Sequence, residues 1–593
     1  MTTKKIHNLF VYLSFFIPFI LYFLTMAPTV SLWDCGEFIS TSVIMGVPHP
    51  PGTPLYLIIS NFFSQIPIFS DIGARVNLVS PIASALSVMF LYMSIVYLIE
   101  EFQKEKNESL IKNYAAFIGA MTFAITDSHW FNSVESEVYA LSTFFTAIVV
   151  WLILKWAKNF NEKFNIKYLI LIAYCLGLAI GIHLLNLLAI PFIALIIFFK
   201  YKKISFYNIF VLMISTGSVF VVIYLGIIKG LPSIANKTNS VVVVILFILI
   251  TAISAIISNI NFNKNLKIIK HIFICLFSFM VLFLTINQIF VTDYKEMLLT
   301  HKRDLGEYAN LLIREQDQLY EKFVSAPTDE ARQFHLLDLI KYNMKLEVAE
   351  SFIQDADTKI ELYDVQGGIN YFELIKKQNP MYMSFGLLMM LLIMSGIVVS
   401  YNNIKNNTSN YYGISRIIIN ATLMIVIGYS TYSLIFIRAQ QNPKINYNNP
   451  HDVESAYEYI NRDQYGQWSI WDREKSLLVN TQGNNESWKR YTHNTKDASF
   501  NEVTNFIWNY QFKEMYLRYF AWQFIGKEVW EDRSWNRNSL DNEELISLPP
   551  LQGVDWTRYG LPLAFLIGLI GFIYQLLYDW RRWLSVIALF ILT

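Results

Sequence analysis

The feature that most constrains this chain is its series of long apolar runs. A helix of about 20 apolar residues crosses the ~30 Å hydrocarbon layer of a bilayer. About twelve runs approach or reach this length, the third being short: 8–27, 77–99, 111–126, 138–156, 166–182, 184–200, 207–228, 239–259, 269–292, 381–401, 414–438 and 557–578. Only 16% of the residues are charged. The sequence therefore predicts an all-α multi-pass membrane protein of about 12 spans.

Lysine and arginine are distributed unevenly among the short connections between these runs. With a cytoplasmic N-terminus, nineteen of them fall in inside connections, and three fall outside: Arg75, Lys229 and Lys237. Positive residues concentrate on the cytoplasmic side of membrane proteins. We therefore expect the first loop, 28–76, and two long polar segments, 293–379 and 439–556, to be extracytoplasmic.

Spans and polar segments together divide the chain into five expected parts. They are an N-terminal transmembrane module at 1–292, a segment of charged helices at 293–379, two transmembrane helices at 380–438, an aromatic-rich segment at 439–556 and a C-terminal transmembrane region at 557–593. Eleven residues follow Arg582, too few for a further span, so we expect the sequence to be incomplete there. A net charge of +1 gives no indication of nucleic-acid binding.

The first outer loop carries the first acidic pair, Asp34 and Glu37, followed by His49 among prolines. From Pro54 onward the apolar residues recur at helical spacing, with Thr53 as a plausible N-cap and Pro54 at the first helical position. Such a helix is too short to cross the bilayer and is expected to lie flat at the outer interface. The loop before it is thereby held between a span and an interfacial helix.

The polar residues of this loop have two interpretations each. Asp34 is well placed to act as a base, but Asp34 or Glu37 could equally cap the helix that follows. His49 is either a ligand or a turn residue. Arg75, just before the second span, could hold a phosphate or pair with Asp71 four residues earlier.

Two further outer connections carry candidate residues. Asn132 and Glu135 have the spacing of a capping box for the next span, whereas Glu137 lies at the start of that span. His183 and Asn186, in "GLAIGIHLLNLL", form either a satisfied turn or one wall of a site.

Several motifs in order resemble the signature of glycosyltransferase family 117. They are "WDCGEF", "GVPHPPGTPLY", "RVNLVSPIASAL", "SVESEVYALSTFF" and "GIHLLNLLAIPF", followed by "NNPHDVESAYEYINRDQYG" and "YQFKEMYLRYFAWQFIG". That family comprises multi-pass enzymes of the GT-C superfamily, related to protein O-mannosyltransferases. Cys35 replaces the small residue usual between the Asp and the Gly of the first motif.

The resemblance implies a GT-C-like bundle that transfers a sugar, mannose being the family expectation, from a polyprenyl-phosphate donor to a hydroxyl of an exported protein or a glycan. It makes Asp34 the base and Glu37 its support, with inversion at the sugar. The substrate-binding set that it implies is His49, Arg75, Glu135, Glu137, His183 and Arg518. The resemblance does not decide whether the site uses a divalent metal, because some GT-C members bind one at this loop and others do not.

The resemblance also implies a bacterial inner membrane with the active site outside. Two other functions remain open from the residues. A transporter or flippase would account for the spans, although transporters usually carry ionisable residues near mid-membrane. A lipid-linked glycan ligase or polymerase would share the donor and differ in the acceptor.

Overall fold

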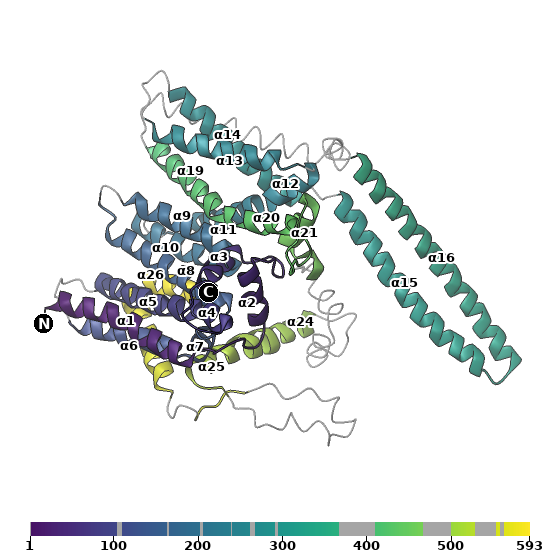
Figure 1. Ribbon diagram of the computed structural model, residues 1–593, viewed down its shortest axis with the longest axis horizontal. Helices are drawn as coiled ribbons and strands as arrows, with labels where there is room; N and C mark the ends of the chain where they lie inside the picture. The colour runs from purple at the N-terminus through teal and green to yellow at the C-terminus, as the bar shows by residue number, and fades with distance from the viewer. Residues whose placement is uncertain are drawn as a thin grey trace. The chain divides into compact units, whose positions relative to one another are not determined.

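The computed structural model describes most of the chain and is helical throughout the described part (Figure 1). The described residues are 2–102, 110–162, 165–201, 205–238, 240–260, 267–290, 294–366, 410–465, 500–527, 553–557 and 562–592. Within them, extended pairing is limited to two isolated bridges, Val47 with Asn446 and Lys527 with Val554.

Eight described helices are long and apolar enough to span a membrane, at 3–25, 72–100, 138–158, 184–201, 207–237, 242–259, 413–440 and 563–591. The multi-pass class is thus confirmed, with fewer long spans than the twelve expected. The runs at 111–126 and 166–182 form helices of 15 residues each, α6 (Leu110–Ala124) and α9 (Ile166–Ile180). The run at 269–292 falls in α14 (Lys267–Phe290), and the run at 381–401 lies outside the described residues.

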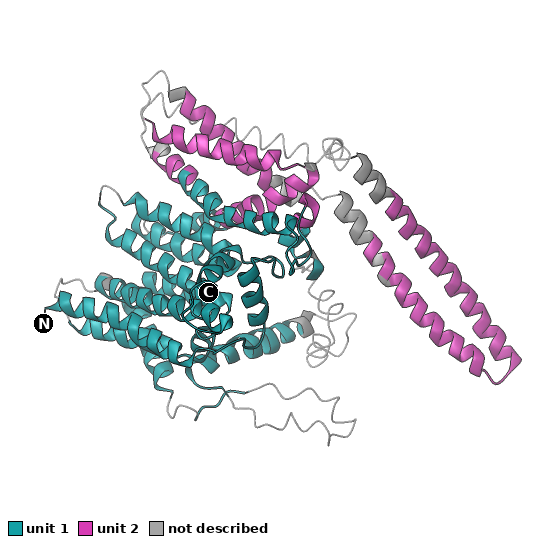
Figure 2. Ribbon diagram, in the orientation of Figure 1, with its two compact units in different colours: residues 1–217, 420–451, 458–593 teal, residues 218–419, 452–457 magenta. Residues whose placement is uncertain are grey.

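The chain forms two compact units (Figure 2). The first contains residues 1–217, 420–451 and 458–593, and the second contains 218–419 and 452–457. The second unit holds a π-helix, η2 (Val222–Lys229), together with α12 (Gly230–Thr238), α13 (Val242–Asn259) and α14. It also holds a long helical hairpin, α15 (Tyr294–Ser325) and α16 (Asp329–Gln366), in agreement with the charged helices expected at 293–379.

In the first unit, α1 (Thr3–Thr25) packs against α5 (Val79–Phe102) and α6. Three fully buried alanines on α6, Ala116, Ala120 and Ala124, recur every fourth residue and allow this close approach. The hydroxyl of Tyr22 on α1 donates to the carbonyl of Ala124 at 2.7 Å. α8 (Val138–Lys158) packs on the other side of α5 and against α9.

The first loop folds into three short helices in front of α5: α2 (Cys35–Ile44), α3 (Pro54–Ser64) and α4 (Ile72–Asn77). The prediction for α3 is confirmed, with Thr53 at its N-cap and Pro54 at its first position. Ser60 and Ser64 are buried, whereas Ile58 and Phe62 are 41% and 64% exposed. The apolar stripe therefore faces outward, as an interfacial helix requires.

The remaining elements of the first unit follow in chain order. They are α7 (Asp127–Asn132), η1 (Leu184–Ala189), α10 (Ile190–Tyr201), η5 (Ser430–Tyr432), α20 (Ser433–Gln440), η6 (Asp463–Tyr465), α24 (Phe500–Phe506), η7 (Ile507–Leu517), α25 (Arg518–Phe524) and α26 (Leu563–Leu592). Three helices, α11 (Phe206–Val221), α19 (Asn410–Tyr429) and α21 (Val453–Asn461), contribute residues to both units. α26 is kinked at Asp579, whose backbone is not helical.

Candidate active site

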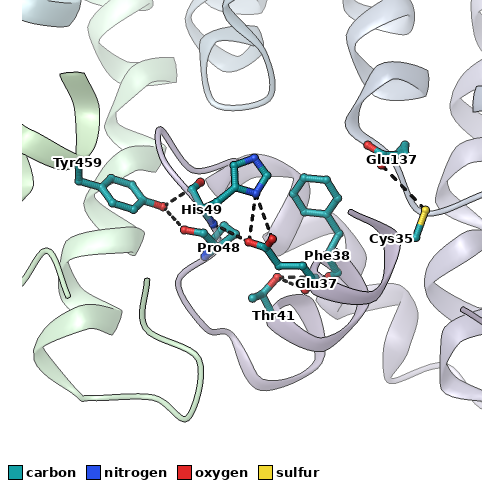
Figure 3. Close-up of polar contacts among 8 residues, drawn as sticks. All are labelled: Cys35, Glu37, Phe38, Thr41, Pro48, His49, Glu137 and Tyr459. Carbon is teal, nitrogen blue, oxygen red and sulfur yellow. Dashed lines mark hydrogen bonds and ion pairs between the residues drawn. The ribbon is translucent and has the colours of Figure 1, made fainter. Parts of the chain in front are cut away.

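The centre of the candidate site is a pair formed by Glu37 on α2 and His49 in the following loop (Figure 3). The carboxylate of Glu37 accepts the backbone N–H of His49 at 2.5 Å and lies 3.1 Å from the imidazole Nδ1. The ring of His49 also contacts Phe38, with 5.7 Å between ring centroids. Glu37 thus fixes both the backbone and the ring of His49, so it does not act as a helix cap.

The contact between Glu37 and His49 changes the pKa of both side chains. The hydrogen bond to Glu37 raises the pKa of His49 above its ordinary value, against the opposing effect of burial. Burial disfavours ionised Glu37, but the hydrogen bonds from His49 outweigh it and lower the pKa of the carboxyl. The charge of Asp34 also raises the pKa of His49. The site therefore favours an imidazolium held by one carboxylate and near a second.

Asp34 occupies the N-cap position of α2, yet its side chain makes no capping hydrogen bond. The residue is exposed, and its carboxylate has no hydrogen-bond or ion-pair partner among the described residues. The capping alternative is therefore excluded for this side chain. An exposed carboxylate without such a partner can accept a proton from a bound hydroxyl.

Asp34, Glu37 and His49 each offer one atom that could bind a metal ion, and these three atoms lie within 4.8 Å of one another. Within the described part of the chain, this is the group of acidic and histidine side chains with the geometry to hold a metal ion. Two carboxylates and an imidazole suit a divalent cation such as Mn²⁺ or Zn²⁺. Metal binding at Nδ1 would replace the hydrogen bond between His49 and Glu37.

Two buried acids lie close to Asp34. Glu137 is 6% exposed and contacts the Cys35 thiol at 4.0 Å, and the backbone N–H groups of Val138 and Asp34 favour its ionised form. Burial, followed by the charges of Asp34 and Glu135, raises the pKa of Glu137 to about 7. Through the backbone of residue 34, Glu137 helps to fix the position of the exposed carboxylate.

Glu135 is 4% exposed and joins three parts of the chain. Its carboxylate accepts from Ser31, and its backbone carbonyl accepts from Ser80 on α5. The expected capping box is wrong, because α8 begins at Val138 with Glu137 at its N-cap, and Asn132 ends α7. Burial raises the pKa of Glu135.

Residues from far along the chain hold the loop that carries His49. Val47 forms a parallel bridge with Asn446, and its N–H donates to the carbonyl of Ile445 at 2.9 Å. The guanidinium of Arg438 on α20 donates to the carbonyls of Met45 and Ile44, at 2.6 and 3.1 Å. These contacts make residues 438–446 part of the site.

Tyr459 makes another of these long-range contacts. The residue is fully buried, and its hydroxyl donates to the carbonyl of Pro48 at 2.6 Å. Gly52 faces it with φ of 78°, and a Cβ at this position would lie 2.6 Å from the Tyr459 hydroxyl. Glycine is therefore required here both by the left-handed backbone and by the space.

Arg462 is a functional candidate that the sequence analysis did not single out. It follows α21 with a φ of 64°, in the left-handed region where glycine usually ends a helix. Its charge adds to burial in lowering the pKa of His183, and it opposes the hydrogen bond from Glu37 that raises the pKa of His49. The motif "NRDQYG" contains it, but no spacing rule connects that motif with residue 49.

Arg75 is hydrogen-bonded to backbone carbonyls of the first loop. Its guanidinium donates to the carbonyls of Phe69, Ser64 and Ser70, at 2.6, 3.3 and 3.4 Å. Asp71 instead caps α4 through the N–H of Ala74 and accepts from Thr29. The expected pairing of Arg75 with Asp71 is therefore not formed, and the donors of Arg75 already have partners.

His183 and Arg518 also have local partners. His183 is the N-cap of η1, where its Nδ1 accepts the N–H of Leu185, and its ring lies 5.6 Å from that of Tyr139. Burial, then Arg462, lowers its pKa. Arg518 pairs with Glu514 at 3.6 Å and lies over the ring of Trp522 at 4.7 Å. The contacts of His183 are thus with η1 and Tyr139, and these contacts of Arg518 are with residues of its own segment.

Fold and site together define a multi-pass membrane protein with an acid- and histidine-bearing first loop. Residues 34–205 match the family "Protein O-mannosyl-transferase TMEM260 N-terminal domain". This part of the chain is therefore similar to the TMEM260 N-terminal domain, and its homology to protein O-mannosyl-transferase TMEM260, a GT-C family member, is distant. The resemblance found in the motifs is confirmed at this level.

Two curated relatives match this chain over a limited length. Protein O-mannosyl-transferase tmem260 of Dictyostelium discoideum is 25% identical over 186 residues, which are 29% of this chain and 21% of the relative. Protein O-mannosyl-transferase TMEM260 of Mus musculus is 23% identical over 157 residues, 26% of this chain and 21% of the relative. The match thus spans about a fifth of the length of these relatives. No solved structure gives a significant match.

Proposed function

We propose that this chain is a membrane glycosyltransferase that moves a sugar from a polyprenyl-phosphate donor to a hydroxyl group of an exported protein. One observation carries the proposal: the exposed, unpartnered carboxylate of Asp34 lies beside the Glu37–His49 pair. Asp34 is also the first residue of the segment that matches the TMEM260 domain. The relatives are named protein O-mannosyl-transferases, which makes mannose the first sugar to test.

The chemistry requires a base on the acceptor side of the sugar. Asp34 removes the proton of the acceptor hydroxyl as its oxygen forms a bond to the anomeric carbon. The bond between that carbon and the phosphate oxygen breaks, and the phosphate leaves with the electron pair. Retention would need a second carboxylate as nucleophile. Because the oxygens of Glu37 are held by His49, the proposal is a single displacement with inversion.

The other site residues take supporting roles in this proposal. Glu37 keeps His49 charged and oriented, and the imidazolium contacts the sugar or the phosphate. Glu137 and Glu135 fix the backbone around Asp34 from the buried side. His183 forms part of the wall, beside Tyr139. Arg75 and Arg518 stay candidates for the phosphate, and both have partners within the chain that a phosphate would have to share or replace.

The membrane and the orientation are part of the proposal. The distribution of lysine and arginine supports a cytoplasmic N-terminus and an extracytoplasmic first loop. The proposed location is a bacterial inner membrane. Cysteine labelling of Trp33→Cys from outside intact cells tests the orientation, because this residue is 81% exposed beside Asp34.

The function is tested with purified protein in liposomes, labelled mannosyl polyprenyl phosphate and a secreted protein as acceptor. We expect label on serine or threonine of the acceptor, and none when a nucleotide sugar replaces the lipid donor. The Asp71→Asn variant should remain active, because asparagine also caps a helix and this carboxylate is already engaged at α4. Movement of the lipid-linked sugar across the bilayer without a new glycosidic bond would contradict the proposal in favour of a transporter.

A further inference from the structure

Two buried acids in the connection between α7 and α8 hold the first loop on both sides of Asp34. The carboxylate of Glu135 accepts a hydrogen bond from the hydroxyl of Ser31 at 2.9 Å. The carboxylate of Glu137 contacts the thiol of Cys35 at 4.0 Å (Figure 3). Because Ser31 stands before Asp34 and Cys35 directly after it, the backbone of the proposed base is tied on each side to the same short connection.

Ser136 lies between these two acids in the sequence and contacts Asn77, the last residue of α4. Both side chains are fully buried, and the hydroxyl of Ser136 donates to the side-chain oxygen of Asn77. The side-chain N–H groups of Asn77 donate to the backbone carbonyls of Ala27 and Thr29, at 2.8 and 2.9 Å. Backbone carbonyls can only accept, so the orientation of the amide is fixed. One side chain thus joins the start of the first loop to the α7–α8 connection.

Two further hydrogen bonds join the same parts of the chain. The N–H of Ala27 donates to the carbonyl of Val134 at 2.8 Å, and the hydroxyl of Ser80 on α5 donates to the carbonyl of Glu135 at 2.6 Å. The first loop, the α7–α8 connection and the start of α5 therefore form one hydrogen-bonded set. Asn77 lies where the three meet.

We propose that Asn77 and Ser136 are positioning residues for Asp34, and that their contact determines where its carboxylate stands relative to a bound acceptor. Asp34 makes no side-chain capping hydrogen bond, so its place depends on the backbone around it. A misplacement of about 1 Å at a reacting group can cost about 10²-fold in rate. The role of Asp34 as base rests on the proposed function, whereas the contacts that hold its backbone do not depend on it.

Three variants of the full-length protein remove the contact: Ser136→Ala, Asn77→Ala and the double variant. Ser136→Ala is the milder change, because the hydrogen bonds from Asn77 to the two carbonyls remain. Tyr22→Phe is its matched control, since it also removes one buried hydroxyl donor, here to the carbonyl of Ala124 between α1 and α6. Asn113→Ala is the control for Asn77→Ala, because the side chain of this fully buried asparagine has no hydrogen-bond partner among the described residues.

Hydrogen–deuterium exchange of the protein in nanodiscs, without substrate, measures whether the contact holds the first loop. We expect Ser136→Ala to exchange about tenfold faster than the wild type, or more, at residues 27–38 and 133–138. Tyr22→Phe should exchange normally there. The control matters because a general loss of stability would speed the exchange of both variants.

Sugar transfer measures whether the same contact acts on the chemical step. The kcat of Ser136→Ala should fall by about 10–100-fold, whereas its KM for the lipid-linked donor should change by less than about twofold. Tyr22→Phe and Asn113→Ala should keep the wild-type kcat at a temperature where all variants are folded. The double variant should lose no more than Asn77→Ala, because both substitutions remove the same contact.

Wild-type exchange at residues 27–38 in Ser136→Ala would overturn the inference, and so would a loss of kcat no greater than that of Tyr22→Phe. These outcomes are separable from failure of the proposed function. A wild type that transfers no sugar, with faster exchange in Ser136→Ala and not in Tyr22→Phe, would contradict the function and support the positioning of the loop. A wild type that transfers sugar, with Ser136→Ala unchanged in kcat, would contradict the positioning role alone.

Discussion

The hydroxyl of Tyr459 donates a hydrogen bond to the carbonyl of Pro48 at 2.6 Å, joining residues 411 positions apart in the sequence. The tyrosine is fully buried, together with Val47, Leu57, Ile435 and Ala439. Through this contact the second polar segment determines where the His49 loop lies. The candidate site is therefore a product of tertiary packing as well as of the first loop.

Tyr459→Phe should destabilise the protein by about 1 kcal/mol, because the Pro48 carbonyl loses its buried donor. The rate of sugar transfer should fall more than the affinity for the donor, since the loop loses its fixed position. Thermal unfolding and steady-state kinetics measure the two effects. Tyr447→Phe is the control, because this side chain is 46% exposed and its hydroxyl has no partner among the described residues. Equal effects of both variants would refute the special role of Tyr459.

Gly52→Ala should cost about 1–3 kcal/mol, because it combines a left-handed backbone with a Cβ placed 2.6 Å from the Tyr459 hydroxyl. In the double variant with Tyr459→Phe, the closest steric contact disappears, while ring carbons at 3.1 and 3.3 Å remain. The total loss of stability should therefore be smaller than the sum of the two single losses. Gly36→Ala serves as control, since its Cβ would meet one side-chain atom at an ordinary 3.5 Å. Strict additivity in urea unfolding would argue against the contact.

Glu37→Gln should change how stability depends on pH. The raised pKa of His49 gives stability that is present below about pH 6.5 and lost as the pH rises through the folded value. The lowered pKa of Glu37 gives stability that is present above about pH 4.5 and lost as the pH falls through its folded value. The variant should therefore lose about 1 kcal/mol between these limits and less outside them. Thermal unfolding from pH 4 to 8 provides the measurement, and parallel curves for the two proteins would contradict it.

Glu137→Gln should have the opposite pH signature. The folded pKa of Glu137, about 7, lies above its ordinary 4.5, so its contribution is complete below about pH 4.5 and lost as the pH rises through 7. Relative to the wild type, the variant should gain stability over this range, by an amount on the order of 1–3 kcal/mol. Glu162→Gln, an exposed control, should show no such gain. A constant difference between Glu137→Gln and the wild type at all pH values would rule out the buried acid as its source.

Much of the fold follows from local sequence patterns. The helix at 54–64, its N-cap and its proline were predictable because apolar spacing and capping act within a few residues. Eight helices of the described residues reach spanning length, because α6 and α9 are helices of 15 residues despite their apolar runs, and the run at 381–401 lies outside those residues. Hydropathy alone does not determine where a helix ends.

The candidate site was predictable only in part. Asp34, Glu37 and His49 lie within one loop, so the sequence could bring them together, but it could not decide between capping and an unpartnered carboxylate for Asp34. For Arg75 the sequence offered a phosphate or Asp71 as partner, but it could not show the hydrogen bonds that the guanidinium donates to carbonyls of its own loop. Arg462 was out of reach because its place depends on contacts across some 400 residues, which no periodicity encodes.

The central claim is that the unpartnered carboxylate of Asp34 is the base. Its most direct test is single-turnover sugar transfer by Asp34→Asn at saturating lipid donor, with donor binding measured on the same preparation. The account predicts that transfer falls by about 10²–10⁴-fold while folding and donor binding remain. Transfer within a few-fold of the wild type would contradict the account.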